Sequence, residues 1–152
     1  MKKIAYLAML ASAVATAPVA VAQDPPSILP AEFAQFAPAE QFGFGMFLVA
    51  KAYTELTASD AVEKDPEGTA AKIEEMTQVV YALYEIPMTE KDHAELQDIQ
   101  AKLMVTPEYN DIQAQGAAAA TKIKSAEYYG SERLRSAIRD FTMGVMGFRR
   151  GE

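Results

Sequence analysis

The feature that most constrains the fold is a repeat of apolar residues every three or four positions, which runs through five segments after residue 41. This spacing places apolar side chains on one face of an α-helix. Asp65-Pro66 and Thr106-Pro107 each join an N-cap residue to a proline at the first helical position. Thr89 and Ser131 are the N-cap residues expected for the third and fifth segments. Ile86-Pro87 ends the second segment and Gly130 ends the fourth. No alternating strand pattern competes, so the sequence predicts an all-α domain.

Short connections between these segments indicate how the helices are arranged. Because short loops make successive helices antiparallel, we expect an up-and-down bundle of about five amphipathic helices. The predicted apolar faces consist of Phe42, Met46, Val49, Tyr53 and Leu56; Ile73, Met76, Val80 and Leu83; Leu96, Ile99 and Leu103; Tyr109, Ile112, Gly116, Ala119 and Ile123; and Leu134, Ile138, Phe141, Val145 and Phe148.

Residues 1–22 have the pattern of a cleaved signal peptide. Lys2 and Lys3 precede an apolar run that reaches Val14, and Ala20-Val21-Ala22 forms a small-x-small cleavage site. The apolar run is shorter than the roughly 20 residues that a membrane span requires. We therefore expect cleavage between Ala22 and Gln23 and a periplasmic or secreted location, with no integral membrane span after cleavage.

The segment after the signal peptide is rich in proline. Pro25, Pro26, Pro30 and Pro38 are spaced too closely for a long helix. The sequence therefore predicts an extended arm over residues 23–41, followed by a helical-bundle domain over residues 42–152.

Composition restricts the chemistry of the chain. It has 14 Lys and Arg against 21 Asp and Glu, and losing Lys2 and Lys3 with the signal peptide changes the formal net charge from −7 to −9. An acidic balance of this size argues against general nucleic-acid binding, which depends on phosphate neutralisation. The chain has no cysteine, so core packing must stabilise the domain without disulfides, and thiol chemistry is excluded.

Catalytic and metal-binding motifs are sparse. His93 is the only histidine, and Glu90-x-x-His93 has the spacing of di-iron carboxylate bundles, which need a second such motif. A solvated helix start is the simpler interpretation. Glu74, Glu75 and Glu85 are candidates for a carboxylate-dependent hydrolase, although acids of this kind usually lie on solvated helix faces. We predict no catalytic residue, no metal site and no cofactor.

Five of the seven phenylalanines lie between Phe33 and Phe47. Among them, Phe33, Phe36 and Phe44 lie before or outside the first apolar stripe. In one account the arm folds back and these rings cover an open groove of the bundle. In the other they form an exposed patch that docks a partner, a client chain or lipid. Phe33, Phe36 and Phe44 are therefore candidate binding residues.

All five arginines lie between Arg133 and Arg150. They either pair with acidic neighbours inside the bundle or provide an anion or partner site around Arg135 and Arg139, which are one helical turn apart. Residues 143–148, Met-Gly-Val-Met-Gly-Phe, add an adaptable apolar surface. Their glycines either fray the helix or allow a close helix crossing. A homo-oligomer contact is compatible with this segment.

Residues 88–96, Met-Thr-Glu-Lys-Asp-His-Ala-Glu-Leu, resemble the helix-opening motif of small periplasmic helical chaperones. The resemblance covers one helix and lacks the glutamine expected after Thr89. The chain is also acidic, whereas those chaperones are basic. The resemblance implies a chaperone that binds client proteins in the periplasm.

The function that these observations favour is an exported, non-enzymatic helical module that contacts a protein partner or client through an apolar Phe/Met surface. The alternatives are a small periplasmic chaperone, a carboxylate-dependent hydrolase, and a small-ligand carrier with a site between helices. A pocket joining two buried acids would favour the enzyme, and a continuous apolar groove would favour the binder.

Overall fold

All the regular structure of residues 29–149, the part of the chain described by the computed structural model, is helical. The all-α fold class is therefore confirmed for this range, whereas the predicted signal peptide and residues 23–28 of the arm lie outside it. In chain order the elements are the 3-10 helix η1 (Ala31–Gln35) and the α-helices α2 (Pro38–Ala58), α3 (Ala61–Lys64), α4 (Pro66–Tyr84), α5 (Glu90–Leu103), α6 (Pro107–Tyr129) and α7 (Glu132–Val145).

The four long helices after α3 begin where the cap residues predicted. The Asp65 side chain accepts a hydrogen bond from the Gly68 amide at 3.0 Å, and the Thr106 hydroxyl oxygen accepts one from the Tyr109 amide at 3.3 Å. Thr89 and Ser131 cap α5 and α7 in the same way. Each cap satisfies one of the amides that a helix start leaves unpaired.

Helix α2 begins earlier than the apolar pattern predicted. The extended arm was expected to reach residue 41, but Ala31–Gln35 form η1 and Pro38 opens α2. A proline at the first helical position loses no intrahelical hydrogen bond. The Ala37 amide also donates to the Glu40 carboxylate at 3.2 Å, which stabilises the helix start. Ala31–Gln35 and the residues from Pro38 onward are therefore helical instead of extended.

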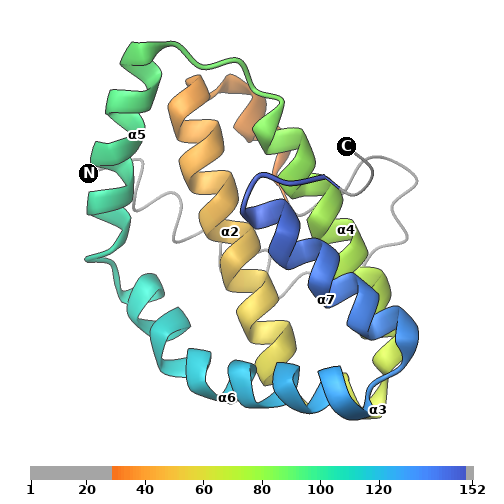
Figure 1. Ribbon diagram of the computed structural model, residues 1–152. Coiled ribbons are helices and arrows are strands. Elements are labelled where there is room, and N and C mark those ends of the chain that lie inside the picture. The colour runs from red at the N-terminus through yellow and green to blue at the C-terminus, as the bar shows by residue number, and fades with distance from the viewer. Residues whose placement is uncertain (1–28, 150–152) are drawn as a thin grey trace.

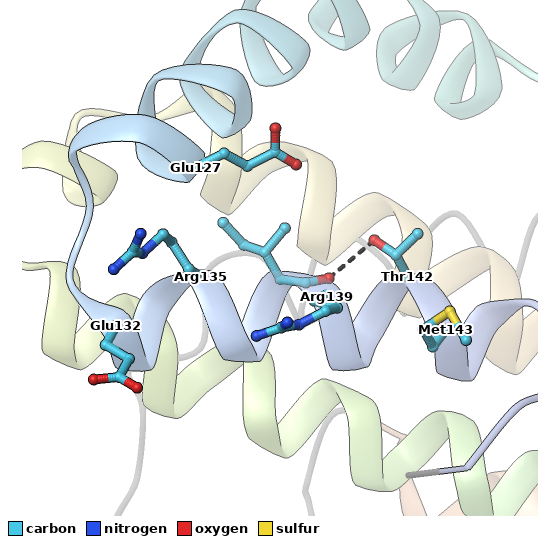
Figure 2. A pocket seen from close by; sticks show the side chains of 7 residues that line it. Glu127, Glu132, Arg135, Arg139, Thr142 and Met143 are labelled. Carbon is cyan, nitrogen blue, oxygen red and sulfur yellow. Dashed lines mark hydrogen bonds between the residues drawn. The ribbon is translucent and has the colours of Figure 1, made fainter.

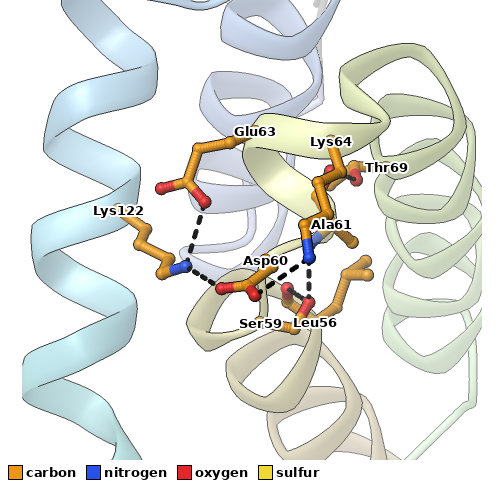
Figure 3. A network of polar contacts seen from close by, with 8 residues as sticks. All are labelled: Leu56, Ser59, Asp60, Ala61, Glu63, Lys64, Thr69 and Lys122. Atoms are coloured by element: carbon orange, nitrogen blue, oxygen red, sulfur yellow. Dashed lines mark hydrogen bonds and ion pairs between the residues drawn. The ribbon is translucent and has the colours of Figure 1, made fainter.

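The short helix α3 was not predicted. Its four residues are too few to show a helical period in the sequence. Val62 is buried there, and Lys122 of α6 pairs with Asp60 at 2.9 Å and with Glu63 at 3.1 Å. Figure 3 shows this ion-pair network between α6 and the α2–α3 corner. The turn thus connects the end of α2 to α6.

The main helix pairings join elements that are far apart in sequence. Helix α2 packs against α4, α5 and α6, whereas α7 packs chiefly against α4. In Figure 1, α6 runs along the lower edge of the view past the end of α2, and α7 lies beside α4. This arrangement differs from a bundle in which each helix pairs mainly with its successor.

Two apolar clusters stabilise the fold, and α2 contributes to both. The larger one joins α4 and α7 with Val49 of α2, and the smaller one joins η1 and α5 with Leu48 of α2. Leu48 and Val49 are each only 1% exposed. Adjacent residues on a helix point in different directions, so α2 is buried on two sides.

Helix α2 also approaches α4 closely at Gly45. A Cβ added there would lie 2.6 Å from Cδ2 of the buried Leu83. A Cβ added at Gly116 on α6 would meet no atom within 4 Å. Gly116 was expected at a core position, but it lies over open space.

We expect Gly45→Ala to lower the free energy of unfolding by about 1 to 3 kcal/mol, because the new methyl group would overlap the buried Leu83 side chain. Gly116→Ala is the matched control and should raise it by up to about 1 kcal/mol, since alanine favours the helix. Denaturant unfolding followed by circular dichroism measures both. Equal stabilisation by the two substitutions would contradict the close approach of α2 to α4.

Tyr53 of α2 stacks on Phe141 of α7, with ring centroids 3.9 Å apart and an interplanar angle of 13°. Burial, with a smaller contribution from the Glu127 carboxylate, raises the pKa of Tyr53 from 10.0 to about 12. The folded chain therefore disfavours the tyrosinate more strongly than the unfolded chain does.

This difference predicts a pH dependence of stability. The stabilisation linked to neutral Tyr53 is complete below the unfolded pKa of 10.0 and is lost as the pH rises through about 12. By about pH 11, the wild type should lose about 1 kcal/mol more than Tyr53→Phe. Urea titrations of both proteins at rising pH test this, and parallel losses would show that Tyr53 is not responsible.

Candidate binding surface on the C-terminal helix

Two of the arginines form ion pairs inside the domain. Arg133 of α7 donates two hydrogen bonds to Glu74 of α4, at 2.9 and 2.8 Å. Arg149 donates to the Glu85 carboxylate at 2.6 Å and to the Tyr81 carbonyl oxygen at 3.2 Å. Arg133 and Arg149 therefore pair with acidic neighbours, which was the first of the two alternatives that the sequence left open for the arginines.

Arg135 and Arg139 are placed differently. Both are exposed on α7, and neither forms an ion pair with another part of the chain that the structure describes. They line a hollow of about 490 Å³ together with other residues of α7 and one from α6. Figure 2 shows the hollow over the outer face of α7. Its remaining lining residues are Glu127, Glu132, Ile138, Thr142 and Met143.

Helical spacing explains why these side chains share one face. Arg135, Arg139 and Met143 are four residues apart, so they lie one above another on α7. Leu134 and Phe141 are buried and direct the other side of the helix toward α4. The arginines must therefore lie on the side of α7 that faces away from the core.

Apolar side chains are exposed at the end of the same helix. Met143, Met146 and Phe148 are 41%, 57% and 57% exposed. A second hollow, of about 220 Å³, is lined by Tyr81, Asp140, Phe148 and Arg149, and it shares Arg139 and Met143 with the first. The two hollows are therefore neighbours on one continuous surface.

The predicted apolar face of the last helix is wrong at Val145 and Phe148, which are exposed. The helix ends at Val145, so its stripe does not continue. Gly147 has a φ of +88°, a conformation that favours glycine and terminates the helix. Gly144 instead serves a close crossing, because a Cβ there would lie 3.1 Å from the Tyr81 ring. Of the two accounts of these glycines, the close crossing therefore holds at Gly144, whereas Gly147 forms a regular helix cap.

The candidate phenylalanines mostly lie in the core. Phe33 and Phe44 are 4% and 3% exposed, and Phe36 is half-buried between them. The ring centroids of Phe33 and Phe36 are 5.1 Å apart, and those of Phe36 and Phe44 are 6.0 Å apart. The rings pack in one apolar cluster with residues of α5, so Phe33 and Phe44 are not available for docking a partner.

The candidate carboxylates are not brought together. Glu74 and Glu85 each pair with an arginine, and Glu75 is exposed. The hydrogen bond from Arg133 lowers the pKa of Glu74, which is the opposite of what a general acid needs. Among residues 29–149 no three acidic or histidine side chains are grouped so that they could hold a metal ion.

Sequence reasoning found Arg135, Arg139 and Met143 but missed the wall of the hollow. Glu127 comes from α6, and no local pattern indicates that it faces α7. Thr142 could have been recognised, because it is three residues after Arg139 and therefore on the same face.

Within the described residues, no helix has both the length and the apolar character needed to cross a membrane.

The buried position of Phe33 predicts the effect of its removal. Phe33→Ala should lower the free energy of unfolding by about 3 kcal/mol, because it leaves a cavity between η1, α2 and α5. Phe148→Ala, at a ring that is 57% exposed, should change it by less than about 0.5 kcal/mol. Chemical denaturation gives the free energy of unfolding of both variants. Equal effects would contradict the burial of Phe33.

Comparisons of the chain with protein-family models, with curated proteins and with solved structures find no match.

Proposed function

We propose that this chain is an exported, non-enzymatic helical module that binds a partner protein through the outer face and the end of α7. The contact residues, which we term the α7 surface, are Arg135, Arg139, Met143, Met146 and Phe148. The observation that carries the proposal is that Arg135, Arg139, Met143 and Phe148 line two adjoining hollows instead of packing inside the domain, and that Met146 is exposed directly after the same helix.

The composition of the α7 surface is typical of protein interfaces. Protein–protein interfaces in general are enriched in arginine, methionine and aromatic residues, and the methionine side chain adapts its shape to different partners. Nine large hydrophobic side chains are exposed among the described residues, and four of them, Met143, Val145, Met146 and Phe148, lie at the end of α7 or directly after it. Single exposed apolar residues are common on protein surfaces, whereas a cluster of them marks an interaction site.

Charge supports a protein partner over a nucleic acid. Glu127 and Glu132 line the same hollow as Arg135 and Arg139, so positive and negative groups are balanced there. Phosphate backbones need a surplus of cations, whereas a protein segment that alternates acidic and apolar residues fits a balanced surface.

Export is part of the proposal. The signal peptide predicted over residues 1–22 would direct the chain out of the cytoplasm, and the working form would begin at Gln23. The partner is therefore expected in the periplasm or outside the cell.

A photo-activated cross-linking residue placed at Met146 in the producing cell tests the proposal. We expect it to form one predominant protein adduct, which mass spectrometry identifies. The same residue at Gln97, which is exposed on α5, is the matched control and should form none. Many unrelated adducts would instead indicate a chaperone, and no difference between the two positions would contradict the proposed surface.

Purified components complete the test. The variant Met146→Ser with Phe148→Ser should bind the identified partner about tenfold or more weakly, because two apolar contacts are lost. Met104→Ser with Val105→Ser removes two other exposed apolar side chains, between α5 and α6, and should bind like the wild type. Calorimetric titration gives the affinities, and circular dichroism shows whether each variant stays folded.

A further inference from the structure

The hollow on α7 carries an inference about what it recognises. Arg135 and Arg139 place two guanidinium groups one helical turn apart on an exposed face, and neither forms an ion pair within the described range. A guanidinium group presents paired N–H donors that match the two oxygens of a carboxylate. Arg133 on the same helix already binds Glu74 with two hydrogen bonds, at 2.9 and 2.8 Å.

The rest of the hollow restricts the ligand further. The Thr142 hydroxyl donates its proton to the Ile138 carbonyl oxygen at 2.9 Å, so the arginines are the main donors to a ligand. Ile138 and Met143 provide apolar contact beside them. A suitable ligand therefore joins a carboxylate to an apolar stem.

The two acidic side chains in the hollow select against highly charged anions. Glu127 and Glu132 balance the two arginines, so the formal charge of the lining groups is zero. A phosphate group or a polyanion would be repelled by these carboxylates, whereas a single carboxylate gains two donors and meets less repulsion. Figure 2 shows Glu127 extending from α6 above the arginines of α7, and its carboxylate adds a negative charge to the lining of the hollow.

We propose that this hollow is a carboxylate-binding site that receives an acidic side chain of the partner protein together with an adjacent apolar side chain. The inference rests on the proposed function and deepens it, because it names the chemical group that the α7 surface recognises. Glu127 acts as a selectivity residue that disfavours ligands with more than one negative charge.

Nuclear magnetic resonance titration of the ¹⁵N-labelled mature chain with hexanoate tests the site. We expect saturable shifts confined to amides near residues 135–143. Hexanamide, which has the same stem without the charge, should bind about tenfold or more weakly, and so should inorganic phosphate. Equal binding of hexanoate and hexanamide, or of hexanoate and phosphate, would overturn the proposal.

Variants separate recognition from a general charge effect. Arg135→Ala with Arg139→Ala should abolish the hexanoate shifts. Lys72→Ala with Lys102→Ala removes the same charge at exposed positions outside the hollow and should leave them unchanged. Glu127→Gln should tighten hexanoate binding about two- to fivefold, because a competing charge is lost. Weaker or unchanged binding in Glu127→Gln would overturn its role in selectivity.

A capped pentapeptide, Ala-Leu-Glu-Leu-Ala, distinguishes a protein side chain from a free acid. It should bind at least as tightly as hexanoate, and its glutamine counterpart should not bind. Tighter binding of hexanoate would show that the site serves a small free acid and would overturn the partner assignment. If neither probe binds but the Met146 adduct forms, the carboxylate inference fails and the proposed function stands. If the peptide binds but no adduct forms, the proposed function fails.

Discussion

Helix α2 must bury two sides at once, and the rest of the architecture depends on this constraint. Leu48 faces the cluster made with η1 and α5, and its neighbour Val49 faces the cluster made with α4 and α7. A helix with one apolar stripe can be satisfied by one partner layer, whereas α2 needs cover in two directions. Helices η1 and α5 pack on one side of α2, and α4 packs on the other side, where it contacts Gly45.

This division leaves α7 in an outer position. It packs on α4 through Leu134 and Phe141, and Tyr53 of α2 reaches it by stacking on Phe141. Glu127 of α6 borders the face that carries Arg135 and Arg139 without burying it, so these side chains reach solvent. The arginine cluster that looks uniform in sequence is therefore split: Arg133 and Arg149 tie α7 and the following residues to α4, and the pair between them lines the hollow.

Local sequence signals predicted where the helices begin, but they did not predict how the helices pack against one another. Cap residues such as Asp65, Thr106 and Ser131 fix helix starts by hydrogen bonds within three residues, so they can be read from sequence. The early start of α2 could not be read in this way, because its proline also suggested an extended arm. The burial of Phe33 depends on α5, which is distant in sequence. For the candidate site, Arg135 and Arg139 were found from their spacing, whereas Glu127 enters only through the placement of α6.

Hydrogen exchange tests the central claim most directly, namely that α7 is the contact face of an otherwise self-contained domain. The mature chain is compared alone and with its cross-linked partner, and protection is read residue by residue. The account predicts that added protection is confined to about residues 135–148, since a docked partner would cover that surface, while α2 is strongly protected in both samples. Added protection on the exposed face of α5 or α6, with α7 unchanged, would contradict the account.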